Sequence, residues 1–358
     1  LWYNAVDGLR LGYRFKGKWE TDEHQTLLGL YSGTASQTPD FELSYSTPLY
    51  ELGSQTRLNA STNRLEGRTE SRLALSRRLF NRFYNDPPFQ EILVGVKAGQ
   101  LFGSDYLPRS IGWEKGWVNT IFISWSYQPN LYQSSLFQIS LESSMLASEW
   151  DFSKVQFSYT VPLVLKKNYL TLESRVFAGY GTGNIPTQDQ FYLSAASPRQ
   201  MFNDKFYRSR GTLPAWSWQR QSDATRHVYY DGEGSMSGYH DANISGRRIW
   251  ANNFNIYFIN PFKLLTEKNF YVLSESETYF FADGGLVWNR DKELKKNLKD
   301  LYRMDAGWGF KYTPVWIPSW WGNYTLQFEF PVWVSDPKAN NKNSHWAWRW
   351  VIGLDHHF

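Results

Sequence analysis

The last thirteen residues of the chain, WAWRWVIGLDHHF, alternate strictly between two kinds of side chain, and they constrain the fold more than any other segment. Because side chains on a strand point to opposite faces with a period of two, every second residue from Trp346 to Phe358 falls on one face. That face is apolar and aromatic, whereas the other carries Arg349 and Asp355. Aromatics placed mostly towards the ends are typical of the interfacial girdles of a transmembrane β-barrel. The pattern predicts that the chain ends on a closing barrel strand, with an outward signature of Trp350, Ile352, Leu354 and Phe358.

Composition points the same way. Hydrophobic residues make up 42% of the chain and the mean hydropathy is −0.53, yet no apolar run approaches the ~18 residues of a spanning helix. The 18 Trp, 23 Tyr and 24 Phe exceed what a soluble core of this size requires, and interfacial belts are where such side chains gather. The absence of Cys excludes disulfides and thiolate chemistry. The net charge of +4 indicates no particular partner, since basic and acidic residues are interspersed.

Alternating segments separated by turn residues recur along the whole chain, so we expect one domain, residues 1–358. Fifteen segments read as strands, an odd count, whereas single-chain bacterial barrels normally have an even number. The aromatic stub Leu1–Ala5 is then the tail of a truncated first strand, which gives sixteen, and a start at Leu1 rather than Met suggests that something upstream was removed. The expected strands are Gly8–Phe15, Thr26–Ser32, Asp40–Thr47, Thr56–Asn63, Thr69–Phe80, Glu91–Phe102, Val118–Tyr127, Leu136–Leu146, Ser153–Leu163, Tyr169–Gly181, Ala251–Asn260, Glu277–Trp288, Leu301–Tyr312, Tyr324–Val334 and Trp346–Phe358.

Clean alternation assigns the two faces of these strands. Val155 and Tyr159 should face lipid, while Lys154 and Gln156 should face the lumen. The lumen is therefore expected to be polar and of mixed sign, which suits a hydrated or plugged interior better than an ion-selective pore. The expected inward polar residues are Glu173, Arg175, Arg303, Asp305, Lys311 and Arg349.

One connection breaks this rhythm, residues 184–246. Loops this long without secondary structure of their own are usually functional or disordered, and a high aromatic content argues against disorder. We expect it to pack against the barrel interior or mouth through Phe202, Phe206, Tyr207, Trp216 and Trp218.

Two stretches carry a family resemblance. Ala178–Gly181 ends a strand and is followed by Asp189–Leu193 and Ser197–Phe202, and farther on the segment FFADGGLVW holds Asp283 at an inward position. In this order the chain resembles the BamA/two-partner-secretion transporter superfamily, the bacterial surface antigen barrels, from residue 169 to the end. The resemblance implies a sixteen-stranded, all-β antiparallel barrel whose long extracellular loop folds back into the lumen.

The resemblance also implies a contact between an arginine at the loop tip and an aspartate on the wall. By position Arg199 is the tip arginine and Asp283 its partner, in a bidentate pair that would latch the loop or simply hold it in place. The glycine that the family has after the arginine is replaced by Gln200. Arg208 and Arg210 remain alternatives, because Arg210 is followed by a glycine.

The function implied by the resemblance is that of the membrane domain of a protein that inserts proteins into, or translocates them across, the bacterial outer membrane. Its expected partners are outer-membrane lipid and lipopolysaccharide, together with an upstream domain or accessory periplasmic or lipoprotein subunits, and no nucleic acid. Two alternatives stay open, a barrel that anchors or exports an upstream catalytic domain and a passive diffusion porin.

We expect no enzyme activity, cofactor or metal. Glu23–His24 and His240–Asp241 could suggest a hydrolase, but the sequence has no nucleophile-elbow, zincin or phosphate-loop motif. His356 and His357 are adjacent on a strand, so they point to opposite faces and cannot share an ion.

Overall fold

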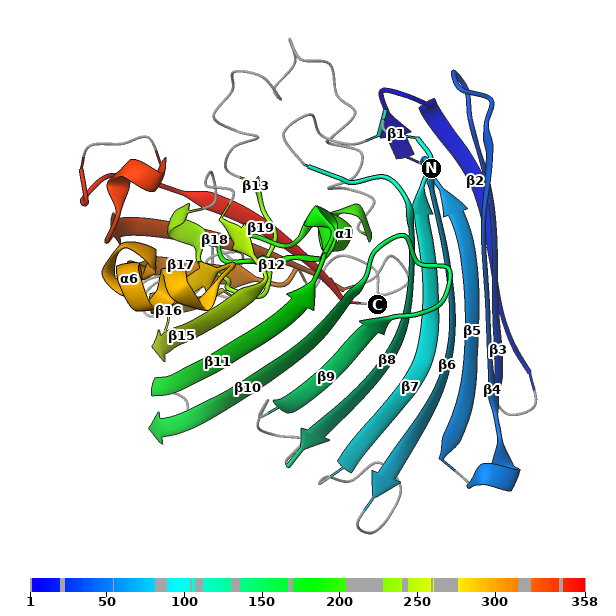
Figure 1. Ribbon diagram of the computed structural model, residues 1–358, viewed down its shortest axis with the longest axis horizontal. Helices are drawn as coiled ribbons and strands as arrows, with labels where there is room; N and C mark the ends of the chain where they lie inside the picture. The colour runs from blue at the N-terminus through cyan, green and yellow to red at the C-terminus, as the bar shows by residue number, and fades with distance from the viewer. Residues whose placement is uncertain are drawn as a thin grey trace, which may run out of the picture.

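The computed structural model describes the chain except for residues 1, 20–22, 54, 81–88, 104, 107–111, 130–135, 167–169, 204–227, 240–243, 259, 261–275, 315–322, 341–343 and 358. In the described part, sixteen antiparallel strands form one curved wall (Figure 1). Eleven precede the long loop: β1 (Trp2–Asn4), β2 (Gly8–Trp19), β3 (His24–Gly33), β4 (Pro39–Pro48), β5 (Thr56–Leu65), β6 (Arg68–Phe80), β7 (Phe89–Leu101), β8 (Trp117–Gln128), β9 (Leu136–Ser144), β10 (Phe152–Lys166) and β11 (Leu170–Gly183). Five follow it: β15 (Arg248–Phe258), β16 (Glu277–Trp288), β17 (Arg303–Tyr312), β18 (Asn323–Val334) and β19 (Val351–His357).

The remaining described elements are short and lie in connections. The long loop contains η2 (Thr187–Asp189), β12 (Phe191–Tyr192), α1 (Pro198–Asn203), β13 (Val228–Tyr229), η3 (Ser237–Tyr239) and β14 (Ser245–Gly246). Elsewhere are η1 (Tyr50–Leu52), α6 (Asp291–Leu301) and η5 (Pro337–Asn340). Among the described helices, none is both long and apolar enough to cross a bilayer.

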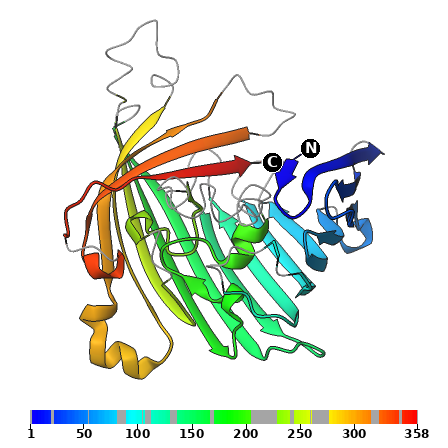
Figure 2. The ribbon, with the colours of Figure 1, turned by 90° about the horizontal axis from the view of Figure 1, so that it is seen from above.

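Each wall strand pairs with its neighbour in the chain, and β11 pairs with β15 across the long loop, from Leu170 with Phe258 to Tyr180 with Arg248. The wall curls so that β19 is directed back toward the first strands (Figure 2). β1 pairs with β2 over three residues, from Trp2 with Arg10 to Asn4 with Gly8, so the stub supplies the sixteenth strand. The prediction of a sixteen-stranded antiparallel barrel is confirmed.

The outer surface of the wall is apolar. Tyr13, Leu30 and Phe280 are 72%, 56% and 55% exposed, although all three lie in the middle of paired strands. Aromatic rings stack across neighbouring strands on this surface, with Trp308 and Phe330 at a centroid distance of 4.2 Å. Exposed apolar side chains on well-paired strands are what a lipid-facing surface requires.

The terminal strand is shorter than predicted. It begins at Val351, and residues 347–350 carry no strand, although Trp346 and Trp348 remain outward at 69% and 67% exposure. Arg349 is 2% exposed and donates hydrogen bonds to the backbone carbonyls of Ser344, His345 and Ala347. The backbone bends around this guanidinium, and pairing with β18 resumes upstream at the bridge of Trp346 with Trp333, with the register shifted by one residue from that of Val351 with Glu329. Ile352 and Leu354 lie in β19, Trp350 lies just before it, and Phe358 falls outside the described residues.

A helix was also missed. The Lys-rich stretch between β16 and β17 forms α6, with Arg290 at its N-cap position. Glu293 caps it by accepting hydrogen bonds from the backbone N–H groups of Asn289 and Arg290 at 3.0 and 3.2 Å. The spacing of Leu294, Leu298 and Leu301 was the available signal, but the many lysines hid it.

A buried ionic cluster joins the first strands at the end of the wall where the long loop emerges, which we call the loop end. The Arg10 side chain is fully buried and pairs with Asp7, at 2.5 Å, and with Asp40. Asn4 donates to Asp7 and Glu66 at 2.9 and 2.8 Å. The guanidinium thus connects β2, β4 and the turn after β5, and removing it would leave buried carboxylates without their counter-ion.

We predict that Arg10→Met destabilises the barrel by about 3–5 kcal/mol, because it breaks a buried charge network by removing one partner. Arg14→Met is the matched control: it lies on the same face of β2 and pairs with Glu42 at 2.6 Å, but its side chain is 42% exposed. Its cost should stay below about 1 kcal/mol. Urea unfolding in detergent, followed by tryptophan fluorescence, measures both, and equal costs would contradict the assignment.

Candidate functional site: the loop against the inner wall

The long loop enters the lumen directly after β11. Gln188 in η2 accepts a hydrogen bond from the backbone N–H of Glu114 at 3.0 Å and donates one to its carbonyl at 3.1 Å. These paired bonds tie the start of the loop to the connection between β7 and β8.

An ion pair within the loop holds its next turn. Arg199 in α1 donates from Nε and Nη2 to the two carboxylate oxygens of Asp189, at 2.5 and 2.7 Å. This pair replaces the predicted contact between Arg199 and Asp283, which is wrong. The bidentate geometry was expected, but the acid lies ten residues upstream in the same loop, so the contact closes the loop on itself instead of fastening it to β16.

The wall surrounds this pair with charge. Lys154 of β10 donates to the backbone carbonyl of Asp189 at 2.6 Å, and Lys97 of β7 lies 3.1 Å from Glu142 of β9. Burial alone would raise the pKa of Asp189, but the charge and hydrogen bonds of Arg199, followed by the charges of Lys97 and Lys154, lower it to about 2. At neutral pH the carboxylate is therefore ionised and fixed.

Helix α1 docks against the early half of the wall. Phe202 is 2% exposed and packs with Leu101 and Tyr106. Arg68 of β6 donates to the side chain of Asn203 at 2.6 Å and lies over the Phe202 ring at 5.1 Å. Phe202 therefore packs inside, as the sequence predicted, while Phe206, Tyr207, Trp216, Trp218, Arg208 and Arg210 fall outside the described residues.

The loop also has an apolar core against the wall. Phe191, Leu193, Met236 and Tyr239 come from the loop and are each 0% exposed. They pack on wall positions that are apolar on the inner face: Phe177, Ile249, Ala251, Val287 and Val334.

Two wall glycines make room for this core. A Cβ at Gly179 would lie 2.5 Å from the Phe191 ring, and one at Gly285 would lie 2.7 Å from a Leu193 methyl. At these two positions the loop side chains therefore approach the wall backbone closely. Burying four large loop side chains contributes on the order of 1.5–3 kcal/mol each, so the loop is held by packing as much as by ions.

Asp283 lies under a different part of the loop. It is 6% exposed, accepts a hydrogen bond from Asn253 at 3.0 Å and faces Asp305 in the β16–β17 register. Asp305 in turn accepts a hydrogen bond from the backbone N–H of Gly238 in η3. The wall carboxylate that accepts a hydrogen bond from this part of the loop backbone is therefore Asp305, and Asp283 lies next to it on β16.

The other expected lumenal residues contact either the loop or other side chains outside it. Arg175 donates to Ser235 of the loop at 3.1 Å, whereas Glu173 accepts from Asn255 at 3.4 Å. Lys311 lies 5.5 Å from the Tyr279 ring centre. At the loop end, Arg303 pairs with Asp336 at 2.9 Å.

The edge of the last strand that faces away from β18 also pairs with the loop. β13 pairs in parallel with β19, Val228 with Ile352 and Tyr229 with Gly353. Sequence reasoning did not foresee this pairing, nor the roles of Asp189, Gly238 and Tyr239. For Asp189 a signal existed, because it is an isolated acid in the approach segment. A strand of only two residues, such as β13, is too short to show an alternating pattern in the sequence.

In the described part of the chain no cluster of three His, Asp or Glu residues could hold a metal ion.

We predict that docking of α1 is insensitive to pH between 7 and 4 and is lost towards pH 2. The pKa of Asp189 is about 2 in the folded loop and 3.8 ordinarily, so its stabilisation is complete above 3.8 and disappears as pH falls through 2. Because the chain has no Cys, spin labels at Met201→Cys and Ser71→Cys report the distance without background. A docked α1 should give a narrow distribution of this distance, and an undocked α1 a broad one. Asp189→Asn should therefore show the broad distribution already at pH 7, and a narrow distribution there would contradict the role of the pair.

Comparison with known proteins supports the fold. No family model and no curated protein matches the sequence. Among solved structures, BamA from Haemophilus ducreyi lacking POTRA domains 1–3 superposes with a TM-score of 0.54 at 12% identity, covering 99% of this chain and 69% of that one. CdiB from Escherichia coli superposes with a TM-score of 0.53 at 11% identity, covering 98% of this chain and 60% of that one. At these identities the likeness establishes a shared barrel fold.

Proposed function

We propose that this barrel resides in the bacterial outer membrane and serves the insertion or translocation of proteins, with the loop of residues 184–246 as a plug of its lumen. The shared fold with BamA and CdiB supports the general role. The single observation that carries the plug is that the loop contacts distant parts of the wall. α1 contacts β6 and β7 through Phe202 and Asn203, while η3 contacts β17 through Gly238.

Parts of this plug can separate from the wall while the barrel stays intact. Apolar packing and hydrogen bonds hold it against the wall, and no disulfide crosslinks it there, because the chain has no Cys. A substrate that competes for these contacts can displace the loop while leaving the wall strands paired. The proposed role requires no catalytic residue, cofactor or metal. Lipid, lipopolysaccharide and an upstream domain or accessory subunits are its proposed partners.

We predict that the wild-type barrel shows small, brief openings in planar bilayers and that Arg199→Glu produces larger and longer ones. The substitution replaces an ion pair with two acids in contact, so the loop start is expelled. Lys338→Glu, an exposed change of the same charge in η5, is the control and should behave as wild type. A large, steady wild-type conductance would identify a diffusion porin and refute the plug.

A direct assay tests insertion and translocation. The barrel is placed in proteoliposomes together with any upstream region of the natural protein, and a urea-denatured outer-membrane β-barrel client is added. We expect the client to become heat-modifiable and protease-resistant at least several-fold faster than with empty liposomes. No acceleration, with an intact plug, would instead favour a barrel that anchors or exports an attached domain.

A further inference from the structure

Helix α6 is fastened at both ends to the outer surface of the wall, at the loop end. Its first residue, Asp291, pairs with Arg248 of β15. Arg248 points outward, because its neighbour Ile249 belongs to the apolar core on the inner face. Tyr302, which follows the helix, places its hydroxyl group over Gly284 of β16, where a Cβ would clash with it. The helix therefore lies beside the lipid-facing surface and not in the lumen.

The outer surface has the character of a membrane interface at this level. Arg248 lies over the Tyr180 ring at 4.5 Å and donates a hydrogen bond to its hydroxyl group at 3.1 Å. Among the early strands, Arg64 pairs in register with the outward Phe41 and lies over the Phe102 ring at 4.8 Å. Arginines among outward aromatic rings mark the depth at which lipid headgroups begin.

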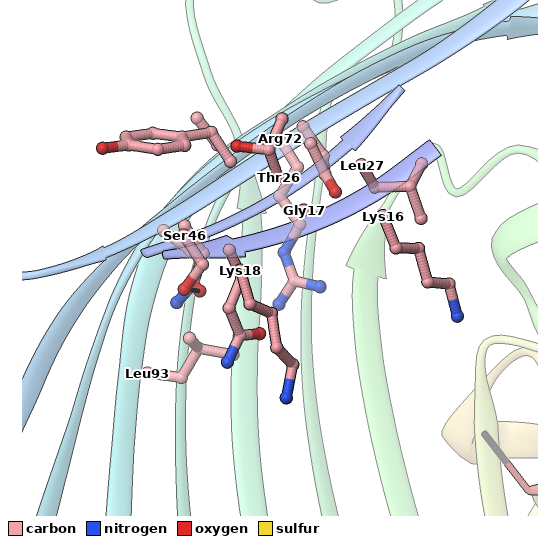
Figure 3. A pocket seen from close by; sticks show the side chains of 15 residues that line it. Lys16, Gly17, Lys18, Thr26, Leu27, Ser46, Arg72 and Leu93 are labelled. Atoms are coloured by element: carbon pink, nitrogen blue, oxygen red, sulfur yellow. Dashed lines mark hydrogen bonds between the residues drawn. The ribbon is translucent and has the colours of Figure 1, made fainter. Parts of the chain in front are cut away.

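The cations of the inner surface are in a different environment. Lys16, Lys18 and Arg72 line a cavity of about 470 Å³ on the inner face of the first strands (Figure 3). The wall separates these side chains from the bilayer. The basic residues of α6, by contrast, belong to a helix that is fastened to the lipid-facing side.

The helix itself is basic and keeps an apolar side chain exposed. Residues 290–301 comprise five basic and three acidic residues. Two of the acids are engaged in the first turn, Asp291 with the wall and Glu293 with backbone N–H groups. Leu298 is 53% exposed, although the helix contacts β16. A Lys-rich helix with an exposed leucine is typical of helices that lie in a membrane interface.

We propose that α6 binds the phosphate-bearing glycolipid headgroups of the outer leaflet, with Leu298 inserted among the acyl chains and the positive charge of the helix attracted to the phosphates. Charge complementarity selects an anionic lipid surface, and continuity with the lipid-facing wall brings that surface within reach. The inference rests on the outer-membrane location in the proposed function and not on the insertion or translocation of clients.

The experiment places a single spin label at Leu298→Cys or at Asp300→Cys in the full chain, which has no other Cys. The two positions lie about 200° apart around the helix, so only the first should be buried in lipid. Nanodiscs contain neutral phosphatidylcholine, alone or with diphosphoryl lipid A, without divalent cations. Power saturation measures contact of each label with a water-soluble nickel complex. We expect lipid A to lower this contact at least about threefold at position 298 and to leave position 300 unchanged.

Charge variants test the attraction to phosphate. Lys295→Gln/Lys296→Gln/Lys299→Gln removes three positive charges and keeps the helix, because Gln and Lys have similar helix propensities. It should return the nickel contact of the label at 298 to its value in neutral discs. The matched control, Arg77→Gln/Arg78→Gln/Lys166→Gln, removes three exposed charges at the opposite end of the wall and should leave the lipid A effect unchanged. Heat-modifiability on gels verifies that every variant is folded.

Three results overturn the proposal. They are a nickel contact at position 298 that lipid A does not change, equal protection in neutral discs, and a lipid A effect that persists in the triple lysine variant. The client assay in proteoliposomes is independent of this test. A barrel that fails to accelerate client insertion but shows the lipid A effect would refute the proposed function and leave the lipid site standing.

Discussion

The structure depends on the pleat of a paired strand, which sends neighbouring side chains to opposite faces while both backbone edges are used by neighbours. Along β10, Val155 and Tyr159 point outward and Lys154 points inward to the loop. A slip by one residue would place Lys154 in hydrocarbon and its apolar neighbours in the lumen, at about 2–4 kcal/mol for the lysine alone near the midplane. The alternation of side chains therefore determines both the lipid-facing surface and the polar groups that the loop contacts.

The loop is matched to that inner surface in two ways. Where the wall is small or apolar, at Gly179 and Gly285, the loop presents Phe191 and Leu193. Where the wall is charged, the loop brings its own neutral pair, Arg199 with Asp189, so that little net charge is buried. Because this ion pair is internal to the loop, the loop can leave the wall without separating it. A contact of Arg199 with Asp283 would have lacked that property.

Period and spacing predicted the wall well, because each wall strand is a local pattern: all fifteen expected strands are present, and the stub at Leu1–Ala5 supplies β1. The partner of Arg199 could not be predicted in this way, since a resemblance can suggest an arginine–aspartate contact but not which acid lies nearest once the loop is folded. The break in the terminal strand at residues 347–350 was not predicted, because hydrogen bonds from the Arg349 side chain to the backbone leave the alternation of Trp346 and Trp348 intact.

The loop covers acids on the late strands of the wall. Asp305 accepts a hydrogen bond from the backbone N–H of Gly238 in the loop, while Glu329 accepts hydrogen bonds from Tyr279 and Gln327 of the wall at 2.8 and 2.9 Å. Displacing the loop would remove the Gly238 donor and open these acids of β17 and β18 to the lumen. An anionic chain would then be repelled from the late strands as it moves through the barrel.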